Sequence, residues 1–266
     1  MATPVTPSPA ATLVLLRDRP PSVVETLLLQ RHAKSKFAAG DYVFAGGKIE
    51  VDDMPPDGER FCRGLTPEQA SARLGGGLAP RVALSYWVGA IREAFEEVGV
   101  LLAYEVHGRL LRITAASRER YEDYRAACQK ANPAFFDMLR AERLTLATDL
   151  VFYFAHWITP EEQPIRFDTR FFVGLKPPEQ EPVADGHEIV DLKWLTPADA
   201  LAAAKRKEIG LRTPTIKNLE LIAAGGAPAS RVVESLGARE VPTIRPRVLQ
   251  VDGKPVPVLP GDPRWY

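Results

Sequence analysis

The sequence has few cysteines, no excess charge of either sign and no long apolar run. Its 266 residues include only Cys62 and Cys128, which cannot build a disulfide framework and form no C-x-x-C pair for zinc. The 34 Lys and Arg equal the 34 Asp and Glu, so the chain lacks the basic excess that bulk nucleic-acid binding requires. No apolar stretch approaches the roughly 18 residues of a membrane helix. We therefore expect a globular cytoplasmic protein with neither a nucleic-acid nor a membrane partner.

The apolar pattern predicts strands first, followed by a mixture of helices and strands. Short apolar runs predict strands at 12–17, 24–31, 42–44, 150–158, 166–175 and 188–194. Helices are expected after Thr66-Pro67 and after Thr196-Pro197, over 81–98, over 115–142 and over 215–224. In the helical stretch 115–142, Asn132 is expected to cap a second helix that starts at Pro133. The predicted class is α+β, with helices on the faces of a mixed sheet.

The predicted helix 81–98 carries an acidic cluster opposite its apolar side. The apolar stripe consists of Val88, Ile91, Phe95 and Val98. Within an arc of roughly 100° on the other side lie Glu93, Glu96 and Glu97. Like charges at this spacing repel one another, and Mg²⁺ or Mn²⁺ takes such oxygen ligands while keeping positions open for phosphate and water. The pattern favours a divalent metal site, with a solvated acidic face as the alternative.

Two segments resemble the halves of the Nudix box. Residues 92–100, R-E-A-F-E-E-V-G-V, are similar to R-E-U-x-E-E-x-G-U, where U is aliphatic and Ala94 is a small version of it. Residues 44–50, F-A-G-G-K-I-E, are similar to the glycine half. Gly46-Gly47 is expected to form a turn after the strand at 42–44 and to let the backbone approach closely, the alternative being a plain turn. Gly47 and Arg92 lie 45 positions apart instead of the usual 14, so about 31 residues are inserted. The usual loop glutamate has no clear equivalent, although Asp53 stands at its nominal spacing from Gly47.

The long insertion resembles the branch of the Nudix family related to the animal peroxisomal coenzyme A diphosphatases. Residues 157–160 and 166–172 are similar to that branch as well. The resemblance implies an α+β fold with a Nudix-like mixed β-sheet sandwiched between helices. We expect one domain over 1–266, interrupted by a loop insertion inside the box at about 51–80. A mostly helical insertion is expected at about 104–146, and an extended C-terminal arm at about 240–266.

The resemblance also implies roles for the box residues. Glu96 and Glu97 would be the main metal ligands, together with the Gly46 carbonyl. Glu93 would be a further ligand or the base that activates water, and Arg92 would orient the carboxylates. The implied cofactor is Mg²⁺ or Mn²⁺, which neutralises charge on bridging phosphate oxygens and polarises water.

Four further residues are weaker candidates. Glu188, in a loop before a strand, is a candidate general base or fourth ligand, or else a solvated carboxylate. Arg166 and Arg170 share one face of a strand and are candidates for binding phosphate, the alternative being a solvent-facing edge with Asp168 as an ion-pair partner. Arg31 follows an apolar run that loosely resembles the stretch before the box in coenzyme A diphosphatases, and we place it with the substrate-binding candidates.

These observations predict a Nudix hydrolase that is a metal-dependent diphosphatase. Its expected substrate is a nucleoside diphosphate linked to another group, with coenzyme A and acyl-coenzyme A among the candidates. The alternative is a Nudix-fold nucleotide-binding or sensor module without turnover. The expected partner is a small nucleotide-type molecule, and a homodimer is left open.

Overall fold

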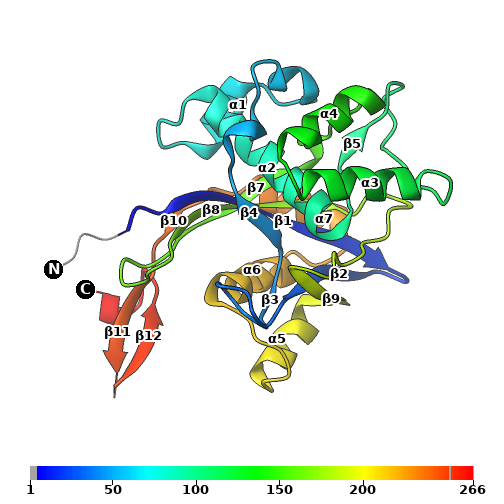
Figure 1. Cartoon of the computed structure of the whole chain (residues 1–266). Helices are drawn as coiled ribbons and strands as arrows, with labels where there is room; N and C mark the ends of the chain where they lie inside the picture. The colour runs from blue at the N-terminus through cyan, green and yellow to red at the C-terminus, as the bar shows by residue number, and fades with distance from the viewer. Residues whose placement is uncertain (1–4, 252, 266) are drawn as a thin grey trace.

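An eight-stranded mixed sheet forms the centre of the computed structural model, which describes residues 5–251 and 253–265 (Figure 1). The strands of this sheet are β1 (Ser8–Arg19), β2 (Val23–Arg31), β3 (Tyr42–Val43), β4 (Ala45–Lys48), β7 (Phe152–Ile158), β8 (Phe167–Leu175), β9 (Ile189–Leu195) and β10 (Thr243–Ile244). Their order is β10-β7-β8-β1-β2-β3, with β4 also paired to β1 and β9 to β2. β1 runs parallel to β8 and β10 parallel to β7, whereas the other pairs are antiparallel. The predicted mixed sheet is confirmed.

Helices cover both faces of the sheet. The first face carries α1 (Pro67–Leu74), α2 (Pro80–Val98), α3 (Arg118–Cys128) and α4 (Pro133–Glu142). The second face carries α5 (Pro197–Lys205), α6 (Thr213–Ala224) and α7 (Ala229–Gly237). Across residues 5–251 and 253–265, no helix combines the length and the apolar character needed to cross a membrane.

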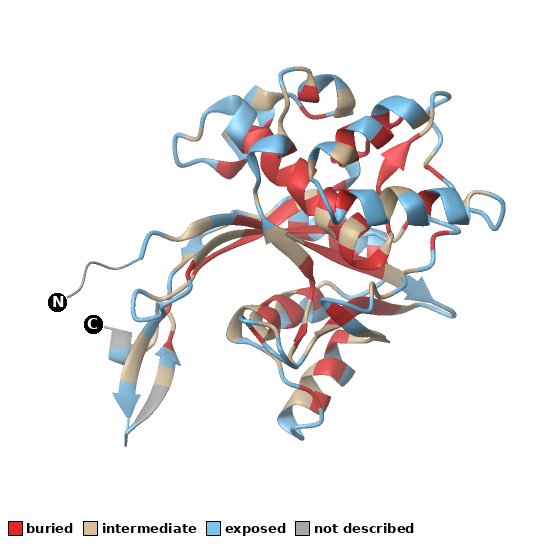
Figure 2. Cartoon of the chain, in the orientation of Figure 1, coloured by how far each residue is buried: buried red, intermediate tan, exposed pale blue. Residues whose placement is uncertain are grey.

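Alternation along the strands divides the interior into two cores. On β1, Leu13 and Leu15 face the core under α2, whereas Val14 and Leu16 face the core under α5 to α7. Figure 2 shows the buried residues concentrated in α2 and in the sheet beneath it. Each leucine that is fully removed from water contributes roughly 2 kcal/mol. The first core therefore fixes α2 firmly against the sheet.

Short elements complete the chain. The small strands are β5 (Ala103–Tyr104), β6 (Thr145–Leu146), β11 (Arg247–Val251) and β12 (Lys254–Val258). The 3₁₀ turns are η1 (Val51–Asp53), η2 (Gly58–Phe61), η3 (Thr148–Leu150) and η4 (Pro263–Trp265). In the C-terminal segment, where we expected an extended arm, β11 and β12 pair as a hairpin that extends away from the helical layers (Figure 1).

Three local features differ from the sequence-based expectations. Gly46 and Gly47 lie in strand β4, paired with Thr12 and Ala11, and do not form the expected turn. Asn132 makes no side-chain cap bond because its backbone is already helical, which turns the side chain away from the amides it would cap. Helix α7 was not predicted, although Val232, Val233 and Leu236 bury one side of it.

Candidate active site

The three carboxylates predicted to bind metal gather where the C-terminal half of α2 meets β4. Glu97 is only 5% exposed, and one of its oxygens, Oε2, accepts a hydrogen bond from the Gly46 amide at 3.0 Å. The Glu93 carboxylate lies directly against Gly47, where an added Cβ would come within 2.5 Å of Glu93 Oε1. A side chain at position 47 would therefore displace Glu93. The close approach expected of the glycines is present, and it occurs within a strand.

The buried side chain of Arg92 is bonded to several carboxylates of this cluster. Its guanidinium donates to Glu93 Oε1 at 2.9 Å and to Glu96 Oε2 at 3.0 Å. The same group donates to both oxygens of Asp53, at 2.6 Å from Nε and 3.1 Å from Nη2. Asp53 is only 1% exposed and belongs to η1, so the first turn of the inserted loop supplies the anchor for Arg92. Asp53 stands at the nominal spacing of the usual loop glutamate from Gly47, but no local feature of the sequence identifies Arg92 as its partner.

The pKa values of all three carboxylates are raised, mainly because burial disfavours their charged forms. Burial raises the pKa of Glu93 to about 7, against the opposing charge of Arg92. Burial also raises the pKa of Glu97 well above its ordinary range, and the charge of Glu93 adds to that effect. For Glu96, burial raises the pKa while Arg92 opposes the rise. Arg92 offsets these effects only in part, so a further positive charge beside the carboxylates would favour their ionised forms.

A divalent cation fits the donor set of this cluster. Glu96 Oε1 is buried and has no hydrogen-bond partner, and carboxylate oxygens are the ligands that hard cations prefer. As the side chains of the described residues stand, however, no three His, Cys, Asp or Glu groups are arranged to enclose an ion. In this arrangement Arg92 bonds to Glu93 and Glu96, and the Gly46 amide bonds to Glu97. A metal would compete with these internal bonds.

Arg31 and Glu188 lie beside the cluster. Arg31 ends β2, and its Nη1 is 3.9 Å from Glu97 Oε1 while its Nη2 is 3.5 Å from Glu188 Oε2. The Glu188 side chain is 65% exposed, in contrast to the buried carboxylates of α2. Sequence positions 31, 97 and 188 are thus brought together at one rim of the site.

Arg166 and Arg170 lie elsewhere and are engaged with protein groups. Arg166 is 5% exposed and donates to the carbonyl oxygens of Val5 and Thr159. Arg170, also 5% exposed, donates to Asp168 Oδ1 at 2.8 Å and to the Tyr86 hydroxyl at 3.2 Å. The ion pair with Asp168 that we considered as an alternative is present, but in a buried setting and not on a solvent-facing edge. Arg170 Nε is buried without a partner.

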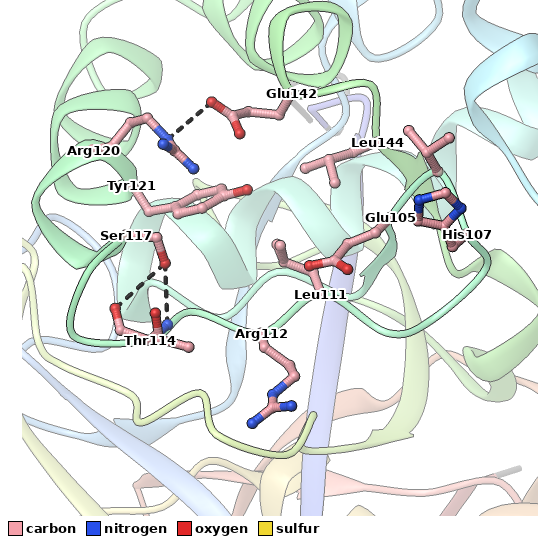
Figure 3. A pocket seen from close by; sticks show the side chains of 11 residues that line it. Glu105, His107, Leu111, Arg112, Thr114, Ser117, Arg120, Tyr121, Glu142 and Leu144 are labelled. Atoms are coloured by element: carbon pink, nitrogen blue, oxygen red, sulfur yellow. Dashed lines mark hydrogen bonds and ion pairs between the residues drawn. The ribbon is translucent and has the colours of Figure 1, made fainter.

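A separate hollow lies among the residues of the helical insertion. This space has a volume of about 660 Å³ and is lined by residues of α3, the end of α4 and the segment after β5. Figure 3 shows the side chains that surround it. Arg120 and Glu142 form an ion pair at 3.0 Å on its wall. None of the predicted site residues lines it. The carboxylate cluster and this hollow are distinct features of the first face.

The sequence profile of the NUDT19 Nudix domain matches residues 65–222, more than half of the chain. The chain belongs to this family. The matched region contains the carboxylate half of the box and begins after the glycine half. The predicted membership of the Nudix hydrolases is thereby confirmed.

Curated relatives and a solved structure extend the match. The acyl-coenzyme A diphosphatase NUDT19 of Xenopus laevis is 27% identical over 270 residues, covering 90% of this chain and 70% of that protein. The Homo sapiens protein of the same name is 28% identical over 295 residues, covering 92% of this chain and 74% of that protein. A crystal structure of a NUDIX hydrolase from Alicyclobacillus acidocaldarius superposes with a TM-score of 0.66 at 26% identity, covering 83% and 92% of the two chains. The α+β Nudix fold is therefore confirmed for this family member.

Proposed function

We propose that this protein is a divalent-metal-dependent diphosphatase that cleaves coenzyme A or its acyl esters. The observation that carries the proposal is the cluster of Glu93, Glu96 and Glu97 at β4, in which buried carboxylates converge with a surplus of negative charge. The named relatives from Xenopus laevis and Homo sapiens, which are acyl-coenzyme A diphosphatases, support the choice of substrate.

The residues that would hold the ion are Glu93, Glu96 and Glu97, with the carbonyl oxygen of Gly46 as a further candidate ligand. When bound, Mg²⁺ or Mn²⁺ would neutralise charge on the diphosphate and lower the pKa of a water. Arg92 keeps Glu93 and Glu96 in orientation through its two bonds to them, and Asp53 keeps Arg92 in place. The protein thus supplies oriented carboxylate oxygens for the ion, and the ion would in turn offset the negative charge of the substrate.

Proton removal from water is assigned to Glu93 in preference to Glu188. Glu93 lies against Gly47 in the centre of the cluster, whereas Glu188 stands at the rim in contact with solvent. A base must lie within hydrogen-bond reach of the water it activates, and a central position meets that requirement. Glu188 then has the secondary role of orienting Arg31, which lies 3.5 Å away.

Substrate contact is assigned to Arg31. It is the only one of the three arginine candidates that borders the carboxylates, and its Nε is buried without a partner. A guanidinium at this rim can pair with the oxygens of a diphosphate. Arg170 stays a weaker candidate because Asp168 and Tyr86 already engage its Nη1.

The test is a product screen with defined substrates. The purified protein is incubated with coenzyme A, acetyl-coenzyme A, ADP-ribose, a dinucleotide and a nucleoside triphosphate, with Mg²⁺ and with Mn²⁺. We expect coenzyme A and its ester to yield 3′,5′-ADP and a 4′-phosphopantetheine product. Turnover of ADP-ribose or the dinucleotide alone would reject the coenzyme A assignment but keep the diphosphatase. Tight binding of nucleotides without any turnover would favour the nucleotide-binding module instead.

A further inference from the structure

The C-terminal end of α2 has all four of its last carbonyl groups bonded. Such groups have no partner inside their own helix and must find one elsewhere. The Phe95 carbonyl accepts from the Gly99 amide at 2.9 Å, and the Val98 carbonyl accepts from the Val183 amide at 3.0 Å. The two remaining carbonyls belong to Glu96 and Glu97, the two residues with the strongest resemblance to Nudix metal ligands.

Side chains of α3 provide the bonds to those two carbonyls. Arg125 donates from Nε to the Glu96 carbonyl at 2.9 Å and from Nη2 to the Glu97 carbonyl at 2.6 Å. Gln129, the C-cap residue directly after α3, donates to the Glu96 carbonyl at 2.7 Å. Three hydrogen bonds thus connect α3 and its C-cap to the backbone of two adjacent residues.

Arg125 and Arg92 act on the carboxylates in different ways. Arg92 bonds directly to the carboxylate oxygens of Glu93 and Glu96, and therefore occupies atoms that a cation would need. Among the residues that the structure describes, Arg125 donates hydrogen bonds to the main-chain carbonyls of Glu96 and Glu97 and to no carboxylate, so it fixes these two residues without using their side-chain oxygens. Its positive charge also lies at the C-terminal end of α2, where a helix favours a cation.

Gly99, the residue that ends α2, lies next to Arg125 of α3. Gly99 follows α2 with a left-handed φ of 70°, which ends the helix. A Cβ added at Gly99 would lie 3.6 Å from Arg125 Nη1. The end of the helix and the arginine are therefore in close contact.

We infer that Arg125, assisted by Gln129, is a positioning residue for the metal-binding carboxylates of Glu96 and Glu97. The helical insertion would then do more than pack against α2, because its side chains would position the metal ligands. The inference rests on the proposed metal site, and it goes beyond it by assigning the supporting contact to α3. Groups that orient metal ligands typically affect metal affinity by about 10- to 100-fold.

The test measures Mn²⁺ binding by electron paramagnetic resonance, independently of turnover. The variants are Arg125→Met, Arg125→Lys and Gln129→Met, and the matched control is Arg118→Met, which alters an exposed arginine in the first turn of the same helix. Arg125→Met should weaken Mn²⁺ binding about 10-fold or more. Gln129→Met should have a smaller effect because it removes one of the three bonds. Arg125→Lys should recover part of the affinity, and the control should match the wild type.

Several outcomes would overturn the inference. One is unchanged Mn²⁺ affinity in folded Arg125→Met with only a lower melting temperature, since that would make the contact purely structural. If Arg125→Met fails to fold, Arg125→Lys and Gln129→Met decide, and wild-type affinity in both would reject the inference. If the wild-type protein itself binds no Mn²⁺, the proposed metal site fails, and that result is distinct from equal binding by wild type and variant.

Discussion

Replacement of Asp53 by asparagine should expose how much the site depends on the inserted loop. Asp53 accepts three hydrogen bonds, two from Arg92 and one from the Glu50 amide at 2.8 Å. Asparagine has nearly the same shape but only one acceptor oxygen, so its amide group must face at least one of these donors. The Asp53→Asn protein would also leave Arg92 with less compensating charge.

The magnitude follows from the burial of the pair. Removing one partner of a buried ion pair costs about 3 to 5 kcal/mol. Arg92 retains Glu93 and Glu96 as partners, so we expect a value near the lower end, about 3 kcal/mol of unfolding free energy. The orientation of the two glutamates should loosen as well, which predicts weaker Mn²⁺ binding by about 10-fold.

The assay is urea unfolding followed by circular dichroism, combined with Mn²⁺ titration of the folded protein. Asp52→Asn is the control because Asp52 is the exposed neighbour of Asp53 in the same turn. An Asp53→Asn protein with wild-type stability and wild-type Mn²⁺ affinity would refute the anchoring role of Asp53.

Three further changes have defined expectations. Gly47→Ala should lower kcat by at least about 10-fold at saturating metal, because the new methyl group displaces Glu93. Steady-state kinetics would measure this loss, and an unchanged kcat would contradict the close packing of Gly47 on Glu93. Arg31→Met should raise KM for coenzyme A more than it lowers kcat, measured with the same assay; a change in kcat alone would contradict substrate contact. Burial alone would raise the pKa of Asp168, but the hydrogen bond with His156 and the charge of Arg170 lower it. Its stabilising effect is therefore fully present above its unfolded pKa of about 3.9 and is lost as pH falls from there through its lower folded pKa. Asp168→Asn should cost about 1.5 to 3 kcal/mol of unfolding free energy at neutral pH, and this difference should shrink in acid below the unfolded pKa; a difference that stays constant over the whole acid range would contradict this.

The helix with the carboxylates was predictable because its signals are local. The apolar stripe, the glutamate spacing and Gly99 all fall within a short segment, and the observed α2 begins one residue before the predicted start and ends at the predicted residue. Strands β1, β2, β3, β7, β8 and β9 were predictable for the same reason, whereas β4, β5, β6, β10, β11 and β12 were not predicted. The apolar runs of the predicted strands are continuous, although β1 proved longer than its run because Ser8 to Ala11 pair with β8 despite low hydrophobicity.

The contacts that support the site could not be found from sequence alone. Asp53 and Arg92 are far apart in the chain, and an aspartate in a Pro- and Gly-rich loop has no local feature that identifies a buried ion pair. Arg125 lies on a helix whose outer face is strongly charged, so nothing distinguishes it from its exposed neighbours until α3 packs on α2. Gly46 and Gly47 predicted a turn because glycine is common there. Close packing of Gly46 against Ala11 and Thr12 of β1, and of Gly47 against Glu93, is what requires their lack of side chains.

The central claim is that the carboxylates of α2 bind a divalent cation that supports cleavage of coenzyme A. The most direct test compares wild type, Glu97→Gln and the control Glu181→Gln, whose side chain is 64% exposed, for Mn²⁺ binding and for release of 3′,5′-ADP from coenzyme A. We predict that Glu97→Gln folds, binds Mn²⁺ weakly and loses at least about 10²-fold in kcat, while Glu181→Gln matches the wild type. A folded Glu97→Gln protein with full activity and unchanged Mn²⁺ binding would contradict the claim.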